Sequence, residues 1–195
     1  AVRKAATRLA TGDAEAPVAI RSDQLRDLLG RPIPSEEVDQ RIDRPGIATG
    51  LAVTGAGGAV LFVETALVDG EGEALLTGKL GDVMKESAAI ARSVVNANAD
   101  RFGVSLPEGK RMHVHFPAGA VPKDGPSAGG TMTTALVSLL SGRTVKPTVG
   151  MTGEVTLQGR VLPIGGVKQK VLAAHRAGLR EVILPVGNGE DLEDV

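Results

Sequence analysis

The chain has 195 residues, a formal net charge of −1 and no cysteine, and only 2% of its residues are aromatic. It is long enough for one well-packed domain with an appendage or for two small domains, and the lack of cysteine excludes a disulfide scaffold, thiolate catalysis and Cys-ligated zinc. Few aromatics and no polybasic block argue against nucleic acid or an anionic membrane as a partner. The absence of cysteine also fits a cytoplasmic protein, and no apolar run approaches the ~18 residues of a membrane span.

Residues 1–44 are predicted to form a helical appendage followed by a linker. Residues 2–10 favour a short helix, and Ser22 is expected to cap a second helix that Gly30 ends. A further helix start at Ser35 lies among prolines that break the pattern. Because the chain lacks an initiator methionine and opens on residues typical of a helix interior, we expect it to be part of a longer protein.

Residues 45–195 are predicted to form one domain of mixed strands and helices. The expected elements are, in chain order, strands over 46–54, 59–68 and 74–77, a helix over 81–102, a strand over 110–116, a helix from Ser127 to 142, strands over 149–157 and 160–163, a helix over 166–177 and a strand over 181–184. The residues expected on the buried side of the first long helix are Val83, Ile90, Ala91 and Val94. Hairpins at 55–58 and 158–159 interrupt the strict alternation of a doubly wound domain, so the sequence indicates an α+β (mixed α/β) fold.

A single hydroxyl, that of Ser127, lies in a stretch rich in glycine and proline. Pro126 stiffens the chain before it, and Gly125 permits backbone conformations that are denied to bulkier residues. At a helix N-terminus, unpaired N–H groups and the helix dipole could hold the oxyanion of an attacked peptide carbonyl. The same string also fits a simple helix cap or an anion site, so by itself it leaves the choice open.

Two lysines follow on the helix that is predicted to start at Gly166. At about 100° per residue, Lys170 falls on the apolar side with Ala174, whereas Lys168 falls next to His175 on a more polar side. Loss of hydration lowers the pKa of a lysine, and a Ser–Lys site requires a neutral amine as its general base. Lys170 is therefore the better candidate, and the alternative is a surface lysine on a half-buried helix.

Other polar residues compete for a role. His113 and His115 lie two apart on a predicted strand, so they should face the same side and could bind a metal or act as a base. The sequence positions no third ligand, so we expect no metal site and favour a structural role. One histidine with Asp124 could complete a Ser–His–Asp triad, but no spacing supports this. Thr152 and Glu154 could place a hydroxyl or a carboxylate near the site or could simply shape a turn.

Three strings in this order resemble the proteolytic domain of bacterial Lon proteases. They are Pro122-Lys123-Asp124-Gly125-Pro126-Ser127-Ala128-Gly129, Met151-Thr152-Gly153-Glu154 and Leu162-Pro163-Ile164-Gly165-Gly166-Val167-Lys168-Gln169-Lys170. The strings from Leu80 to Ser87 and from His113 to His115 extend the resemblance, which covers roughly residues 46–187.

The resemblance implies roles for individual residues. Ser127 is the nucleophile, Lys170 is the base that takes its proton, and backbone N–H groups at the start of the Ser127 helix hold the oxyanion. Thr152 corresponds to a family position close to the lysine. The residues with less defined roles in the matching strings are Asp124, Gly125, Pro126, Glu154, His113 and His115.

The resemblance also implies a whole protein: an ATP-dependent, homohexameric, cytoplasmic serine endopeptidase that degrades unfolded, damaged and regulatory proteins in quality control and stress. Residues 1–44 would then be the tail of the helical small domain of an AAA+ ATPase module. ATP and Mg²⁺ would bind in that module and not in this chain, whose glycine-rich segments lack the Gly-Lys-Ser/Thr ending of a P-loop. Nucleic acid is a partner for the full-length family, but the charge of this chain does not support it, and no membrane partner is implied.

The chain departs from the family pattern at two places and leaves two alternatives. Val53 stands where the family often has an aromatic residue, and the chain stops at Val195, before the last strand and helix that we expect in a Lon domain. One alternative is a non-proteolytic Lon-like scaffold for oligomerisation or DNA association, which the presence of both Ser127 and Lys170 disfavours. The other is a domain that is active only when joined to its ATPase, with the loop around Asp124 holding an inactive arrangement.

Overall fold

The computed structural model describes residues 1–30, 42–55, 57–117, 121–193 and 195. The chain divides into two compact units, Ala1–Glu36 and Glu37–Val195. No helix within the described ranges is long and apolar enough to cross a membrane.

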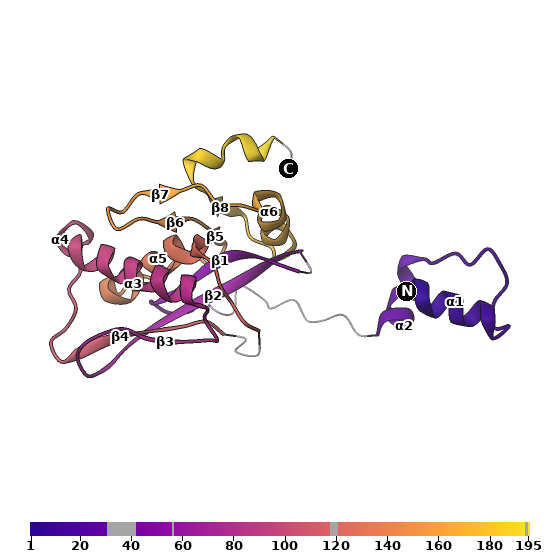
Figure 1. Ribbon diagram of the computed structural model, residues 1–195, viewed down its shortest axis with the longest axis horizontal. Helices are drawn as coiled ribbons and strands as arrows, with labels where there is room; N and C mark the ends of the chain where they lie inside the picture. The colour runs from indigo at the N-terminus through magenta and orange to yellow at the C-terminus, as the bar shows by residue number, and fades with distance from the viewer. Residues whose placement is uncertain (31–41, 56, 118–120, 194) are drawn as a thin grey trace. The chain divides into compact units, whose positions relative to one another are not determined.

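The first unit is helical (Figure 1). Its elements are helix α1 (Val2–Ala10), the 3-10 turn η1 (Ser22–Gln24) and helix α2 (Leu25–Leu29). Helix α1 and the end of α2 at Gly30 confirm the predictions, whereas Ser22 as a helix cap is wrong. Arg21 occupies the cap position, and its backbone N–H donates to Gln24 Oε1 at 3.1 Å. The helix start predicted at Ser35 lies outside the described residues.

The second unit contains a six-stranded mixed sheet, a two-stranded sheet and flanking helices. Its elements are β1 (Ile47–Thr54), β2 (Gly57–Asp69), β3 (Leu75–Thr77), α3 (Asp82–Ala97), α4 (Ala99–Phe102), β4 (Lys110–His115), the 3-10 turn η3 (Pro126–Ala128), α5 (Gly129–Ser141), β5 (Val149–Met151), β6 (Glu154–Val155), β7 (Val161–Leu162), α6 (Val167–Arg176), β8 (Glu181–Ile183) and the 3-10 turns η4 (Val186–Asn188) and η5 (Glu190–Leu192).

The strand order in the main sheet is β3-β4-β2-β1-β5-β8. The pairs β1–β2 and β2–β4 are antiparallel, while β3–β4, β1–β5 and β5–β8 are parallel. The β1–β2 hairpin turns where Thr54 pairs with Gly57, as predicted. The sheet combines parallel and antiparallel strand pairs, and helices connect several of its strands along the chain. This arrangement confirms the predicted mixed α/β fold.

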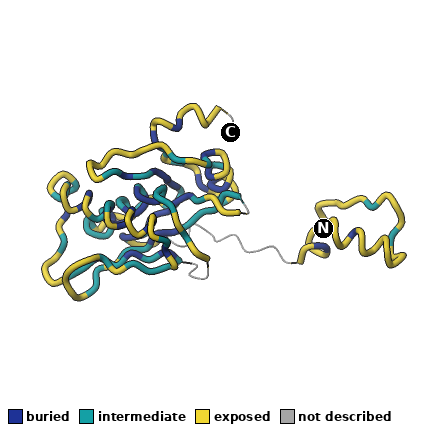
Figure 2. Tube along the Cα trace, in the orientation of Figure 1, coloured by how far each residue is buried: buried dark blue, intermediate teal, exposed yellow. Residues whose placement is uncertain are grey.

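Helices cover both faces of this sheet. Neighbouring residues on a strand point to opposite faces, and on β2 Val63 packs against α3 and α5, whereas Phe62 packs against Ala174 of α6. The larger core, between the sheet and the α3–α5 pair, includes fully buried Met132 and Phe116. Figure 2 shows the buried residues concentrated where these helices meet the strands.

The structure corrects two predicted elements. The strand expected over 149–157 is split, because β5 leaves the main sheet at Thr152 and the chain then forms β6, which pairs with β7 in a sheet of their own. The helix expected over 81–102 is also split at Asn98, whose side-chain amide donates to the Val94 carbonyl at 2.8 Å. Val83 is 45% exposed and so is not on the buried side, where Met84 lies instead.

Candidate active site

A pocket of about 480 Å³ opens where the end of β1, the start of α3, the η3 turn and the start of α6 meet. Ser127 and Lys170 both line it, as do Asp124, Pro126 and Glu154. The apolar residues of its wall are Ala52, Val53, Leu61, Met84, Ala128, Pro163 and Ile164. The fold therefore brings five of the predicted site residues, from three separate stretches of the sequence, to one cavity.

Ser127 lies in the η3 turn, immediately before α5. Gly125 precedes the turn with a φ of 117°, a conformation that favours glycine, and Pro126 starts the turn. The carbonyl oxygen of Ser127 accepts the backbone N–H of Gly153 at 2.8 Å and the hydroxyl of Thr152 at 3.2 Å. The backbone of Ser127 is thus fixed, while the residue remains partly accessible at the pocket.

Asp124 ties the loop before this turn to the start of α3. Its Oδ1 accepts the backbone N–H groups of Met84 and Gly125, each at 2.9 Å, and a carboxylate at a helix N-terminus is electrostatically favourable. A Cβ at Gly81 would lie 2.3 Å from the carboxyl carbon of Asp124, so only glycine leaves room for this contact. The carbonyl of Lys123 accepts the Gly81 N–H at 2.7 Å and strengthens the same junction.

Lys170 is buried on α6, with only 3% of its surface exposed. Its Nζ donates to Thr152 Oγ1 at 3.1 Å, and the Thr152 hydroxyl in turn donates to the Ser127 carbonyl. Burial lowers the pKa of the Lys170 ammonium from its ordinary value of 10.5, because the charged form loses hydration. Lys168 is exposed, so the prediction that Lys170 is the lysine on the buried side is confirmed.

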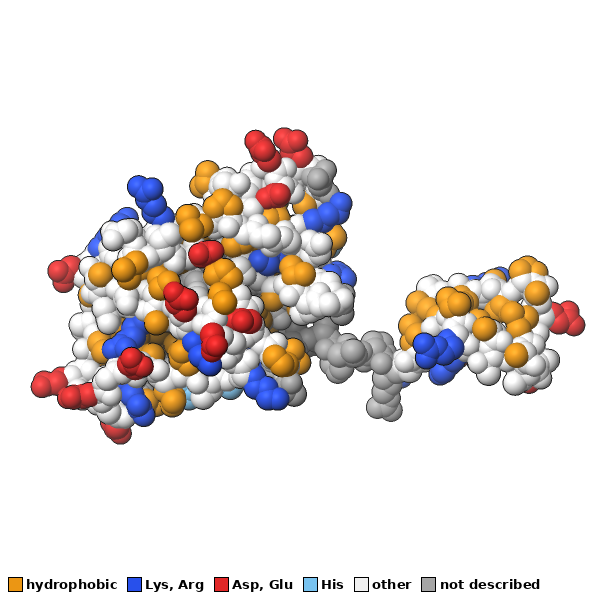
Figure 3. Space-filling view, in the orientation of Figure 1, with side chains coloured by type: hydrophobic (Ala, Val, Ile, Leu, Met, Phe, Trp, Pro, Cys, Tyr) orange, Lys and Arg blue, Asp and Glu red, His pale blue; other side chains and the backbone are white. Residues whose placement is uncertain are grey.

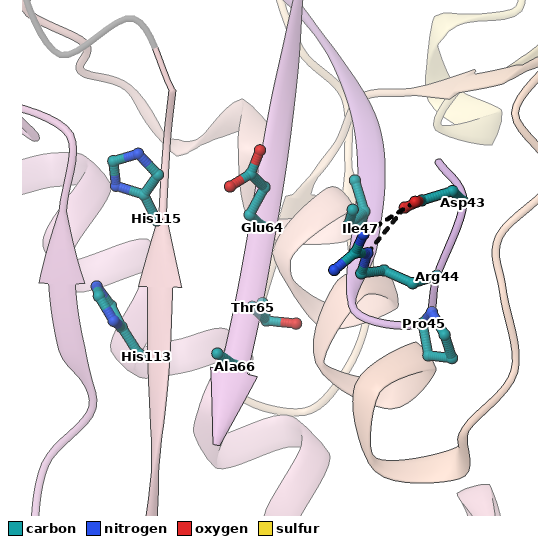
Figure 4. Close-up of a pocket in the computed structure, with 9 residues that line it drawn as sticks. All are labelled: Asp43, Arg44, Pro45, Ile47, Glu64, Thr65, Ala66, His113 and His115. Atoms are coloured by element: carbon teal, nitrogen blue, oxygen red, sulfur yellow. Dashed lines mark hydrogen bonds and ion pairs between the residues drawn. The ribbon is translucent and has the colours of Figure 1, made fainter. Parts of the chain in front are cut away.

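His113 and His115 line a different pocket, of about 530 Å³, which extends from β4 across β2 to the start of β1 and the residues before it (Figure 4). The Thr77 hydroxyl lies 2.8 Å from His113 Nε2 and 2.7 Å from His115 Nδ1. Glu64 on β2 is paired in register with His115. Across the described part of the chain, no group of three or more His, Asp or Glu residues is arranged to hold a metal ion.

Two parts of the Ser127 pocket were not predicted as site residues. Val53 at the end of β1 and Ile164 before α6 both line the pocket. Strand β1 pairs with β5 only at residues 49–50, since β5 leaves the sheet at Thr152, and the end of β1 therefore borders the pocket. No local sequence pattern indicates this, because it depends on where a neighbouring strand departs.

Known proteins match this chain along most of its length. A family model described as the Lon protease (S16) C-terminal proteolytic domain matches residues 19–195. The Lon protease of Mycolicibacterium smegmatis is 60% identical over 197 residues, which cover 100% of this chain and 25% of that protein. The Lon protease of Salinispora arenicola (strain CNS-205) is 62% identical over 182 residues, covering 92% of this chain and 23% of that protein.

A eukaryotic protein also matches. Mouse Lon protease homolog 2, peroxisomal, is 53% identical over 188 residues, covering 93% of this chain and 22% of that protein. The chain thus spans about a quarter of the length of these relatives. By the family match and these identities, the chain belongs to the Lon protease C-terminal proteolytic domains.

Proposed function

We propose that this domain hydrolyses peptide bonds with Ser127 as nucleophile and Lys170 as general base. The observation that carries the proposal is the buried amine of Lys170, which lines the same pocket as Ser127 and is linked through Thr152 to the Ser127 backbone. A lysine whose pKa is lowered by burial is neutral in a larger fraction of molecules, and only the neutral amine can accept a proton.

In the first half of the reaction, the Ser127 hydroxyl gives its proton to Lys170 Nζ while Oγ attacks the substrate carbonyl carbon. The tetrahedral intermediate collapses when Lys170 returns that proton to the departing amine, which leaves an acyl ester on Ser127. In the second half, water gives a proton to Lys170 and attacks the ester, and Ser127 recovers its hydrogen as the carboxylic acid leaves. Thr152 keeps Nζ oriented through both halves.

Backbone N–H groups at the η3 turn would stabilise the oxyanion. The N–H of Gly129 already donates to the Pro126 carbonyl, and that of Gly130 donates to the Gly153 carbonyl at 3.0 Å. We therefore assign the oxyanion to the N–H groups of Ser127 and Ala128, at the N-terminal end of α5, where the helix dipole favours negative charge.

For the whole protein we propose an ATP-dependent, cytoplasmic, homohexameric protease that degrades unfolded, damaged and regulatory polypeptides in quality control and stress. The basis is the membership of the family together with the greater length of the relatives. ATP and Mg²⁺ would bind in an AAA+ module outside this chain. Lysine, arginine and acidic side chains are interspersed on the face of the second unit shown in Figure 3, which favours polypeptide over nucleic acid as the substrate.

The test is peptidase activity of the full-length protein on a fluorogenic peptide. Ser127→Ala and Lys170→Ala should each abolish turnover and leave the circular dichroism spectrum unchanged. Lys168→Ala is the matched control, because this lysine is two residues away on the same helix but exposed, and it should retain most of the activity.

The outcome separates the proposal from its alternatives. A Lys168→Ala variant as inactive as Lys170→Ala would overturn the assignment of the base. A folded wild-type protein with no Ser127-dependent turnover would instead favour the non-proteolytic scaffold. Turnover by the full-length protein but not by this chain alone would support a site that works only when the ATPase is attached.

A further inference from the structure

We propose that Asn188 is a positioning residue for the Ser127–Lys170 site, an inference that rests on the proposed peptidase function. Asn188 ends the η4 turn, has 3% of its surface exposed and lies outside the pocket wall. Its side chain holds the segment that forms one side of the pocket and leads into the helix of Lys170.

The Asn188 side chain pairs with Ile164 as a neighbouring strand would. Its Oδ1 accepts the Ile164 N–H at 2.9 Å, and its Nδ2 donates to the Ile164 carbonyl at 2.9 Å. A side-chain amide carries the same donor and acceptor as a peptide group, so this residue satisfies both backbone groups of Ile164 at once. One side chain thus makes the two hydrogen bonds that a neighbouring β-strand would make, at a position just after β7 of the two-stranded sheet has ended.

Asp191 fixes the direction of this amide. Its Oδ2 accepts a hydrogen bond from Asn188 Nδ2 at 2.6 Å. A carboxylate only accepts hydrogen bonds, so the NH₂ group of Asn188 must face it, and this orientation also aims the NH₂ at the Ile164 carbonyl. The reversed amide would place its oxygen against the Asp191 carboxylate and the Ile164 carbonyl, and its NH₂ against the Ile164 N–H, so Asp191 reinforces the orientation that clamps Ile164.

The clamped segment connects directly to the catalytic lysine. Ile164 lines the pocket, and Gly165 and Gly166 follow it before α6 begins. The carbonyl of Gly166 accepts the Lys170 N–H at 3.0 Å, in the first turn of that helix. Two successive glycines have little conformational preference of their own, so the position of this junction depends on contacts that fix its neighbours.

Close packing supports the same junction from two sides. A Cβ at Gly187, next to Asn188, would lie 2.5 Å from Pro163 Cγ, which shows how closely η4 approaches the segment. A Cβ at Gly166 would lie 2.5 Å from Val53 Cγ2 on β1. The segment is therefore held between β1 and η4, and the Asn188 amide supplies its directional contact on the η4 side.

The test compares Asn188→Ala with Glu190→Gln in the full-length protein. Glu190 is exposed in the following turn and serves as the matched control. Misplacement of a catalytic group by about 1 Å can cost ~10²-fold in rate, so we expect Asn188→Ala to lower kcat/KM by about 10- to 100-fold, with a raised KM because Ile164 is part of the pocket wall. A purely global loss of stability would reduce the active fraction without changing KM.

Hydrogen exchange supplies a readout that does not depend on turnover. The Ile164 amide should exchange faster in Asn188→Ala and at the wild-type rate in Glu190→Gln. Asp191→Ala should raise KM and Ile164 exchange to a smaller extent, and it should add nothing in the Asn188→Ala background, because Asp191 acts only through Asn188.

The results distinguish failure of this proposal from failure of the proposed function. Asn188→Ala with wild-type KM overturns the positioning role, whatever the exchange of Ile164 shows. If Asn188→Ala does not fold, Asp191→Ala at its exposed position decides, and unchanged KM with unchanged exchange overturns the proposal. A wild-type protein without Ser127-dependent turnover refutes the peptidase function, and unchanged Ile164 exchange in Asn188→Ala would then refute the clamp separately.

Discussion

Thr152→Val tests the link between Lys170 and Ser127 without changing the shape of the side chain. Thr152 is buried, with 3% of its surface exposed, and its hydroxyl makes two contacts: it accepts from Lys170 Nζ at 3.1 Å and donates to the Ser127 carbonyl at 3.2 Å. Valine has nearly the same volume but no hydroxyl, so it leaves the buried amine without this partner. The Ser127 carbonyl keeps the N–H of Gly153 at 2.8 Å, so we expect the fold to persist.

The expected loss follows from the cost of an unsatisfied buried group. Leaving a buried donor without its acceptor costs about 1–3 kcal/mol, and at about 1.4 kcal/mol per factor of ten this corresponds to roughly a 5- to 150-fold fall in kcat if the whole effect falls on the transition state. KM should change little, because Thr152 does not line the Ser127 pocket. The assay is steady-state hydrolysis of a fluorogenic peptide by the full-length protein.

Thr152→Ser is the control, because it keeps the hydroxyl and removes only the methyl group. It should retain most of the wild-type kcat. Wild-type kcat in Thr152→Val would refute the reasoning, and so would a Thr152→Ser variant as slow as Thr152→Val, since the methyl group would then be the part that matters.

Four further predictions concern the charge of Lys170, the loop at Asp124 and the two histidines. Burial lowers the pKa of Lys170 below 10.5, so the folded protein binds this proton less tightly than the unfolded chain. Because only the neutral amine can act as the base, kcat/KM should fall as the pH drops through the lowered pKa. A flat pH profile would contradict a lysine base. For the same reason, burying the charged Lys170 destabilises the folded protein, so Lys170→Met should raise the free energy of unfolding measured in urea. The gain should be largest at pH values below the lowered pKa and should shrink as the pH rises toward 10.5. A gain that grows with pH would contradict this prediction. Gly81→Ala should displace Asp124 and slow peptide hydrolysis in a folded protein, because the added Cβ would lie 2.3 Å from the Asp124 carboxyl carbon. Replacing both His113 and His115 with alanine should leave kcat unchanged. Loss of turnover in that double variant would make the histidines candidates for catalysis again.

Local patterns gave most of the secondary structure correctly. The hairpin of β1 and β2, helix α5 and helix α6 lie where hydrophobic periodicity and glycine positions predict them. Periodicity misplaced the buried side of α3, because Val83 near its start is exposed while Met84 reaches both the core and the pocket. The first turn of a helix has residues of that helix on only one side of it, so the elements packed around the turn decide which of its residues are buried.

The split of the predicted strand over 149–157 had no local signal. Thr152 and Gly153 carry nothing that forbids an extended chain, and β5 ends there because the next residues make contacts elsewhere. The Thr152 N–H still donates to the Ile183 carbonyl of β8 at 3.1 Å, but the Gly153 N–H donates to the Ser127 carbonyl at 2.8 Å. Those partners lie more than twenty positions away in the sequence, so only long-range contacts could place the end of this strand.

The sequence by itself determined the choice between the two lysines, since a helical period of about 3.6 residues is a local property, and it pointed to Ser127 as the candidate nucleophile only through the resemblance of its glycine-rich string to the Lon family. Tertiary structure decided that Thr152 joins Lys170 to the Ser127 backbone and that Asp124 lies at the start of α3. It also decided that the histidines line a separate pocket and that Asn188 holds Ile164. These contacts join segments distant along the chain, and the packing of the sheet and its helices brings them within hydrogen-bonding distance.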